Sequence, residues 1–165
     1  MTAAVGSLTE TQFLTFQTND ESFGIGILHI KEIIEYNGVT PIPKIPNIIP
    51  GVINLRGNVV PILDLSMLLY KKAVDAGKKT CIIIVEADYL GEKLDIGILV
   101  DSVREVVDIP SGMIEPPPSF GSKIKIDYIY GIGKLEEQFL VLLNVSSILS
   151  LEELNVLAIE GNIDK

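Results

Sequence analysis

The sequence predicts a mainly β protein that is built from two related, barrel-like halves. Short β-branched runs are bounded by Gly, Pro, Asn and Asp, which is the pattern of strands between turns. The order of these runs recurs in the second half, where the range 131–149 overlays the range 51–69. The 165 residues suffice for one domain or for two small subdomains that share a core.

The hairpins appear in the same order in both halves. The range 13–30 predicts two strands around a polar turn, and the range 81–100 predicts the same arrangement. A similar strand follows each hairpin, at Ile30–Glu35 in the first half and at Val103–Asp108 in the second. Prolines come after both of these strands, so each is predicted to end in a loop.

The clearest repeat lies in the segments 51–69 and 131–149. Its identical pairs are Gly51/Gly131, Leu55/Leu135, Leu63/Leu143, Ser66/Ser146 and Leu69/Leu149. We interpret the chain as an internal duplication, with subdomains at 11–70 and 80–150 and a linker at 71–79. A hairpin-rich half of this size suits a small closed or nearly closed barrel, which hides the edges of its sheet.

Short helices are predicted at two places. Ser150 and Glu153 form a capping box, and the leucines that follow Ser150 share one helical face. We therefore predict a C-terminal helix at 151–159 that docks on the barrels. Asp64 can cap a second short helix that runs to Tyr70.

The charge and composition exclude several classes of function. The formal net charge is −9 and the pI is about 4.5. Binding to nucleic acid or to an anionic membrane needs a basic footprint, which this chain lacks. No apolar run approaches the roughly 18 residues that a membrane-spanning helix needs. The mean hydropathy of +0.40 therefore indicates buried sheets and apolar contact patches.

The termini and the cysteine content indicate a reducing compartment. Cys81 is the only cysteine, so it has no partner within the chain for a disulfide. The segment Met1–Thr9 lacks the basic and apolar regions of a signal peptide. We therefore expect a cytoplasmic protein without direct membrane insertion.

The sequence does not supply a catalytic or metal-binding set. His29 is the only histidine, and we interpret it as part of an otherwise apolar strand. Cys81 has no neighbouring base and is interpreted as a small hydrophobe. The glycine pairs of Gly24-Ile25-Gly26 and Gly131-Ile132-Gly133 lack the third glycine of a phosphate loop and are typical of bulges or close backbone approaches. We expect no enzymatic activity, no cofactor and no metal.

The segment 51–61 is the strongest candidate for recognition. Two β-branched runs flank a turn in which Arg56 is the only charge, and Gly57 can take a positive φ. Arg56 is therefore predicted at or beside a loop tip on a rigid sheet. The second half replaces Asn54, Arg56 and Gly57 with Lys134, Glu136 and Glu137. Positions that differ between the halves are free to bind a partner, although Arg56 could also be a solvated loop charge.

A protein-binding module fits these features better than an enzyme does. Protein interfaces favour aromatic, aliphatic or Arg anchors within a polar rim. Arg also makes bidentate contacts with a carboxylate, which Lys cannot do. An enzymatic or small-ligand barrel would instead need an enclosed polar cavity with convergent titratable groups.

Residues 51–65, which read GVINLRGNVVPILDL, resemble the hallmark segment of the CheW family of chemotaxis coupling proteins. The resemblance covers about residues 11–155 and leaves flexible tails at 1–10 and 160–165. Its supporting matches are Phe23-Gly24-Ile25, Lys31-Glu32-Ile33, Val39-Thr40, Leu99–Val103, Ile114–Pro117 and Leu142–Val145. The resemblance implies two SH3-like five-stranded β-barrels around a shared core, with short helices including a C-terminal one.

The resemblance also implies a function without catalysis. Members of the family bridge the cytoplasmic tips of methyl-accepting chemoreceptors and the histidine kinase CheA, through its regulatory domain. Such a protein would be cytoplasmic and recruited to receptor arrays at the inner face of the membrane. The receptor-binding residues implied for this chain are Asn54, Arg56, Gly57, Ile30, Glu32, Ile33 and Val103.

Two alternatives remain open at this point. The chain could be a CheW-like regulatory or scaffold module of a larger protein, such as the CheA regulatory domain or a receiver-linked coupling protein. It could also be a small-ligand-binding β-barrel.

Overall fold

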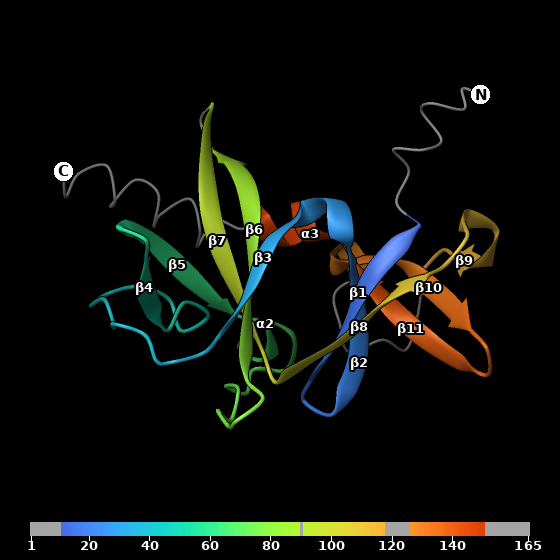
Figure 1. Cartoon of the computed structure of the whole chain (residues 1–165), viewed down its shortest axis with the longest axis horizontal. Coiled ribbons are helices and arrows are strands. Elements are labelled where there is room, and N and C mark those ends of the chain that lie inside the picture. The colour runs from blue at the N-terminus through green and yellow to red at the C-terminus, as the bar shows by residue number, and fades with distance from the viewer. Residues whose placement is uncertain (1–10, 90, 118–125, 151–165) are drawn as a thin grey trace.

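The computed structural model describes residues 11–89, 91–117 and 126–150. The predicted C-terminal helix at 151–159 and the predicted tails lie outside these residues. Within them, the protein is mainly β, as the sequence predicts, and its strands form two sheets with short helices between them (Figure 1). None of the helices in the described ranges is long and apolar enough to cross a bilayer.

The first sheet has six strands in the order β8-β1-β2-β11-β10-β9. These strands are β1 (Gln12–Thr18), β2 (Glu21–Gly26), β8 (Ser102–Asp108), β9 (Ile114–Glu115), β10 (Ile129–Leu135) and β11 (Gln138–Leu143). Neighbouring strands are antiparallel except β2 and β11, which pair in parallel.

The second sheet has five strands in the order β3-β6-β7-β5-β4, with β5 and β7 parallel. Its strands are β3 (Ile30–Glu35), β4 (Gly51–Leu55), β5 (Asn58–Asp64), β6 (Cys81–Tyr89) and β7 (Glu92–Val100).

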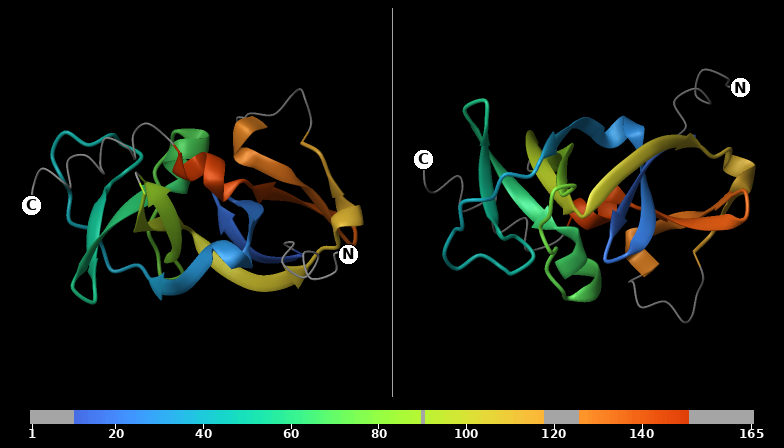
Figure 2. Two further views of the ribbon diagram at one scale, coloured as in Figure 1. Left: turned by 90° about the horizontal axis from the view of Figure 1, so that it is seen from above. Right: turned by 60° about the horizontal axis from the view of Figure 1, so that its bottom comes forward.

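The helical segments are η1 (Ile27–His29), α2 (Leu65–Tyr70), η2 (Ser111–Met113), η3 (Ile126–Tyr128) and α3 (Val145–Leu149). The two views of Figure 2 keep β4 and β5 at one end of the molecule and β10 and β11 at the other.

The two sheets do not coincide with the ranges 11–70 and 80–150 expected for the subdomains. The β1–β2 hairpin belongs to the first half of the chain but pairs with β8 and β11 of the second half. The β6–β7 hairpin of the second half pairs in turn with β3 and β5 of the first half. The chain crosses between the sheets at η1 and again at Asp101, so the two halves exchange equivalent hairpins.

The exchange preserves the internal repeat. If β1, β2, β3, β4 and β5 are matched with β6, β7, β8, β10 and β11, the strand order of one sheet becomes that of the other, apart from the additional edge strand β9. Both sheets also carry an irregularity of register at the same place, near Thr15 in the β1–β8 pair and near Lys31 in the β3–β6 pair. The duplication predicted from sequence is therefore present as two equivalent sheets.

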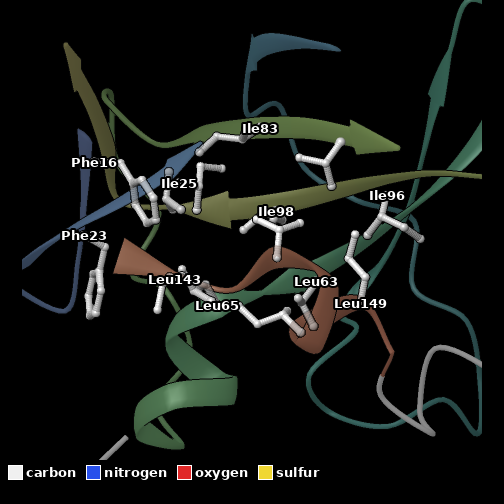
Figure 3. Close-up of a cluster of buried hydrophobic side chains, with 14 of the residues drawn as sticks. Phe16, Phe23, Ile25, Leu63, Leu65, Ile83, Ile96, Ile98, Leu143 and Leu149 are labelled. Carbon is white, nitrogen blue, oxygen red and sulfur yellow. The ribbon is translucent and has the colours of Figure 1, made fainter. Parts of the chain in front are cut away.

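The main core lies between the two sheets. Figure 3 shows Phe16, Phe23 and Ile25 of the six-stranded sheet facing Ile98 of the five-stranded sheet, with Leu143 nearby. Helices α2 and α3 add apolar side chains to the same cluster. Burial of this apolar surface by both sheets joins them into one unit.

Each sheet also encloses a smaller core of its own. Ile82 and Ile84 of β6 point into the cluster of the five-stranded sheet, whereas Ile83 and Val85 point into the core between the sheets. Because both faces of β6 are buried, its sequence is a continuous apolar run rather than an alternating one. Phe13, which corresponds to Ile82, lies in the equivalent cluster of the six-stranded sheet.

Two side chains cap the short helices. Asp64 Oδ1 accepts a hydrogen bond from the Met67 backbone N–H at 3.1 Å, which confirms the predicted start of α2. Asn144 at the equivalent position of the repeat accepts from the Ser147 N–H at 3.1 Å and begins α3. Helix α3 is not among the predicted helices, although Asn144 occupies the position of Asp64 in the repeat and could have indicated it. Ser150 lies at the C-terminal end of α3.

Candidate functional site

A two-residue turn between β4 and β5 presents Arg56. The register of the hairpin closes at Leu55 and Asn58, which leaves Arg56 and Gly57 as the central residues. Their φ angles are 52° and 89°, and positive φ at both positions is what a type I′ turn requires. The Asn54 Oδ1 atom accepts a hydrogen bond from the Gly57 backbone N–H at 2.9 Å. Asn54 and Gly57 therefore hold the turn, and Arg56 projects from it.

Arg56 does not point freely into solvent. Its guanidinium forms a bidentate ion pair with Glu32, in which Nη1 donates to Oε1 at 3.2 Å and Nη2 donates to Oε2. The Arg56 side chain is nevertheless 67% exposed. Glu32 lies on β3, at the opposite edge of the sheet from β4, so the pair spans the two edge strands of the five-stranded sheet.

The ion pair changes the ionisation of both groups. The hydrogen bonds from Arg56 lower the pKa of the Glu32 carboxyl, and those to Glu32 raise the pKa of Arg56. Both groups are therefore charged at neutral pH. The outward donors of the guanidinium stay accessible to a second acceptor, because Arg carries five N–H groups and Glu32 engages one on each terminal nitrogen.

A second ion pair lies beside the first one. Lys31 Nζ donates to Asp95 Oδ1 at 2.9 Å and lies 3.7 Å from Glu86 Oε2. Lys31 is the extra residue where the register of β3 shifts against β6, between Ile30 and Glu32. The hydrogen bond to Asp95 raises the pKa of Lys31. Acidic and basic side chains of β3, β6, β7 and the β4–β5 turn therefore form two neighbouring groups of ion pairs.

The apolar residues implied for the site lie on the two equivalent edge strands. Ile30 of β3 and Val103 of β8 are half-buried and pack against the core between the sheets. Ile33 is 42% exposed. The structure thus brings Asn54, Arg56 and Gly57 together with Glu32, whereas Val103 belongs to the other sheet.

Several exposed residues near this surface were not predicted. Leu28 of η1 is 61% exposed where the chain crosses between the sheets, and Val59, which follows the β4–β5 turn, is 71% exposed. Lys31 and Asp95 were missed because their partnership depends on strand pairing. The sequence does not reveal that Leu28 is exposed, because a large apolar residue beside a histidine has the same pattern in a crossover as in the core.

The other candidate residues have structural surroundings. His29 lies in η1 and not in a strand as predicted, because the chain turns there from one sheet to the other. Cys81 is half-buried, and its Sγ donates to the Lys79 carbonyl at 3.2 Å. A Cβ on Gly24 would lie 2.9 Å from Leu142 Cδ2, so this glycine marks a close approach. No group of three metal-ligating side chains occurs within the described ranges.

Comparisons with known proteins agree with this architecture. Residues 12–153 match the model of the CheW-like domain family. The chain is 36% identical over 149 residues to the chemotaxis protein CheW of Klebsiella aerogenes, covering 90% of this chain and 87% of the relative. It is 35% identical to the chemotaxis protein CheW of Helicobacter pylori, covering 84% of this chain and 81% of that one.

A solved structure shares the fold. The crystal structure of the scaffolding protein TtCheW from Thermoanaerobacter tengcongensis superposes with a TM-score of 0.75 at 30% identity, covering 88% of this chain and 91% of the other. The family match spans most of the chain and includes both sheets and the Arg56 turn. The chain therefore belongs to the CheW family.

Proposed function

We propose that this protein couples methyl-accepting chemoreceptors to the histidine kinase CheA, as a non-catalytic adaptor. The family is one of chemotaxis scaffolds, which supports an adaptor over an enzyme. The acidic charge of −9 and the absence of a basic footprint favour a protein partner over nucleic acid. The place of action would be the cytoplasmic side of receptor arrays.

The observation that carries the proposal is the exposed Arg56 on its preorganised turn. A rigid two-residue turn keeps the guanidinium in place before binding, so little conformational entropy is lost when a partner docks. Glu32 orients the guanidinium, and the apolar Ile33 lies one residue further along β3. We assign the receptor tip to this surface, with Ile30 and Val103 as its apolar border.

The experiment compares two charge reversals in the full-length protein. Arg56→Glu removes the cation and places a carboxylate beside Glu32, so we expect receptor co-sedimentation to fall at least tenfold while the CD spectrum is unchanged. Lys78→Glu is the matched control, because Lys78 is an exposed cation in the segment between α2 and β6. We expect Lys78→Glu to bind receptor normally.

The same co-sedimentation experiment tests the proposed link to the kinase. CheA should co-sediment with receptors only when the wild-type adaptor is present. If Arg56→Glu recruits receptor as well as Lys78→Glu does, the role of Arg56 is wrong. If the wild-type protein fails to link CheA to receptors, the coupling function itself is wrong.

A further inference from the structure

The wall of the five-stranded sheet contains a slot between its two edge strands. The cavity has a volume of about 520 Å³. Its lining residues come from the end of β3, the following loop, β4 and β6, and they are Ile34, Glu35, Asn37, Gly38, Val39, Thr40, Val52, Ile53, Asn54, Leu55 and Ile82. We call this cavity the seam slot.

The seam slot is framed at both ends by contacts between its two sides. At one end, Thr40 and Val52 exchange two backbone hydrogen bonds, with N–O distances of 2.8 and 2.9 Å. At the other end, the Arg56–Glu32 ion pair joins the β4–β5 turn to β3. Between these contacts β3 and β4 do not pair with each other, since they lie at opposite edges of the sheet.

The backbone of β4 turns unpaired groups toward the slot. Leu55 and Asn58 close a two-residue hairpin, so Leu55 and Ile53 use their N–H and C=O groups to bond β5. Asn54 lies between them, and its N–H and C=O point away from β5. The N–H and C=O groups of Val52 also point away from β5, and both are hydrogen-bonded to Thr40. The next backbone groups along this edge, those of Asn54, are therefore open to a partner.

The backbone of β3 does the same from the other side. The Tyr36 N–H donates to the Thr80 carbonyl at 3.2 Å, which directs Tyr36 and, by alternation, Ile34 toward β6. The N–H and C=O groups of Glu35 therefore point away from β6 and toward the slot. Two strand edges with open donors and acceptors face one cavity, which is the arrangement that an added strand uses.

The side chains define what can enter. Ile82 forms part of the wall, and Ile34, Ile53 and Leu55 belong to the same apolar cluster inside the sheet. Glu35 is the only charged residue of the lining, and no ion pair within the described residues involves it. An aliphatic side chain therefore fits the interior, and a cation fits the rim.

We propose that the seam slot binds a short extended polypeptide segment of a partner protein by backbone hydrogen bonding to the edge of β4. The segment carries an aliphatic side chain that enters the slot and a neighbouring Lys or Arg that pairs with Glu35. This site adjoins the receptor contact, because Asn54 lines the slot and the Arg56–Glu32 ion pair lies at one end of it, but it uses other groups, namely the backbone of Asn54 and the carboxylate of Glu35.

The other sheet shows that the equivalent edge accepts a strand. In the six-stranded sheet, β9 adds to the edge of β10, with Glu115 opposite Ile132 and Ile114 opposite Gly133. These two positions of β10 correspond to Val52 and Ile53 in the repeat. At β4 the described part of the chain pairs with this edge only through the bridge between Thr40 and Val52. The edge of β4 beyond this bridge can therefore pair with a segment of another protein.

The test uses the full-length ¹⁵N-labelled protein and the peptide acetyl-Thr-Val-Arg-Val-Thr-amide. Amide exchange and chemical shifts are followed by NMR as the peptide is added. We expect the Asn54 and Glu35 amides to exchange fast in the free protein and to slow at least tenfold on saturation. The Ile53 and Leu55 amides, which already bond β5, should change less.

Three controls make the result decisive. Two versions of the peptide, each N-methylated on one backbone edge, test the hydrogen bonding, and one of them should lose binding. Glu35→Gln should weaken binding by about two- to fivefold, as loss of an exposed ion pair does. Asp108→Asn, at the equivalent position of the other sheet, should leave binding unchanged.

Four outcomes overturn the proposal. They are the absence of protection at Asn54, equal binding of both N-methylated peptides, equal binding by Glu35→Gln, and sensitivity to Asp108→Asn. None of these results bears on receptor co-sedimentation, so failure here is separate from failure of the coupling function.

Discussion

At the scale of the residue, the most informative contact is the pairing of Arg56 with Glu32. The sequence identifies Arg56 by its absence from the second half of the repeat, where Glu136 has a similar φ of 56°. Both hairpins therefore have a two-residue turn whose first residue has positive φ, but only the β4–β5 turn, with Gly57, has positive φ at the second residue as well. In the six-stranded sheet the residues equivalent to Arg56 and Glu32 are Glu136 and Glu105, which are both acidic and cannot form this pair. Of these two equivalent turns, only the β4–β5 turn therefore carries a basic side chain.

The pairing predicts an unusual titration of Glu32. Hydrogen bonds from Arg56 lower its pKa, so we expect the Glu32 carboxyl to titrate below the usual range of glutamates. Because the folded-state pKa lies below the unfolded one, the stabilisation is present above the unfolded pKa and is lost as the pH falls through the folded pKa. Carboxyl ¹³C NMR measures this directly. In Arg56→Ala the Glu32 titration should return toward its normal position, and an unchanged curve would contradict the ion pair.

At the scale of the element, capping shows how the repeat positions its helices. Asp64 is the last residue of β5 and Asn144 directly follows β11, and in each half one side-chain oxygen of this residue caps the start of a short helix. Asp64 has a second task, because its Oδ2 accepts from the Val74 N–H at 3.0 Å and so fixes the segment that follows α2. Burial raises the pKa of Asp64, while the backbone hydrogen bonds oppose the rise. The buried carboxylate is thus retained where it serves two backbone donors.

These two caps predict unequal costs of truncation. Asn144→Ala removes one hydrogen bond and should destabilise the protein by about 1 kcal/mol. Asp64→Ala removes the cap and also leaves the Val74 N–H without its acceptor, so it should cost about 2–3 kcal/mol. Urea denaturation followed by CD gives both values. Equal losses in the two variants would mean that the bond to Val74 contributes nothing.

At the scale of the whole molecule, the exchange of hairpins makes the two halves of the chain interdependent. The β1–β2 hairpin supplies two central strands of the six-stranded sheet, and the β6–β7 hairpin does so for the five-stranded sheet. Their side chains also form most of the core between the sheets. A partner that contacts both edge strands β3 and β8 therefore binds a surface that the exchange itself builds.

This arrangement predicts that neither half folds alone. The fragments 1–79 and 80–165 each lack the hairpin that completes their sheets, so we expect both to give unfolded NMR spectra when isolated. An equimolar mixture should recover the dispersed spectrum of the intact chain, because the missing strands are then supplied in trans. Cooperative folding of either isolated fragment would contradict the exchanged topology.

The sequence predicted many local features because their causes are local. The strand positions follow from β-branched runs between breakers, and the Arg56 turn follows from Gly57 and its flanking strands. The helix cap at Asp64 is predictable for the same reason, because it depends on residues that are close together in the sequence. The helix α3 is hard to predict because it is only five residues long, and a strand is predicted at His29 because nothing local marks a crossover.

By itself, the sequence determined a duplicated, mainly β chain with one polar turn that its second half lacks. Only the tertiary structure decided which copy of each hairpin enters which sheet, since equivalent hairpins carry similar apolar patterns and fit either sheet by pattern alone. It also decided that Arg56 meets Glu32 and that Lys31 meets Asp95, because these pairs are 24 and 64 residues apart in the chain and are brought together by strand pairing. Local preferences act over a few residues, whereas the choice among long-range pairings rests on the burial of the whole core between the sheets.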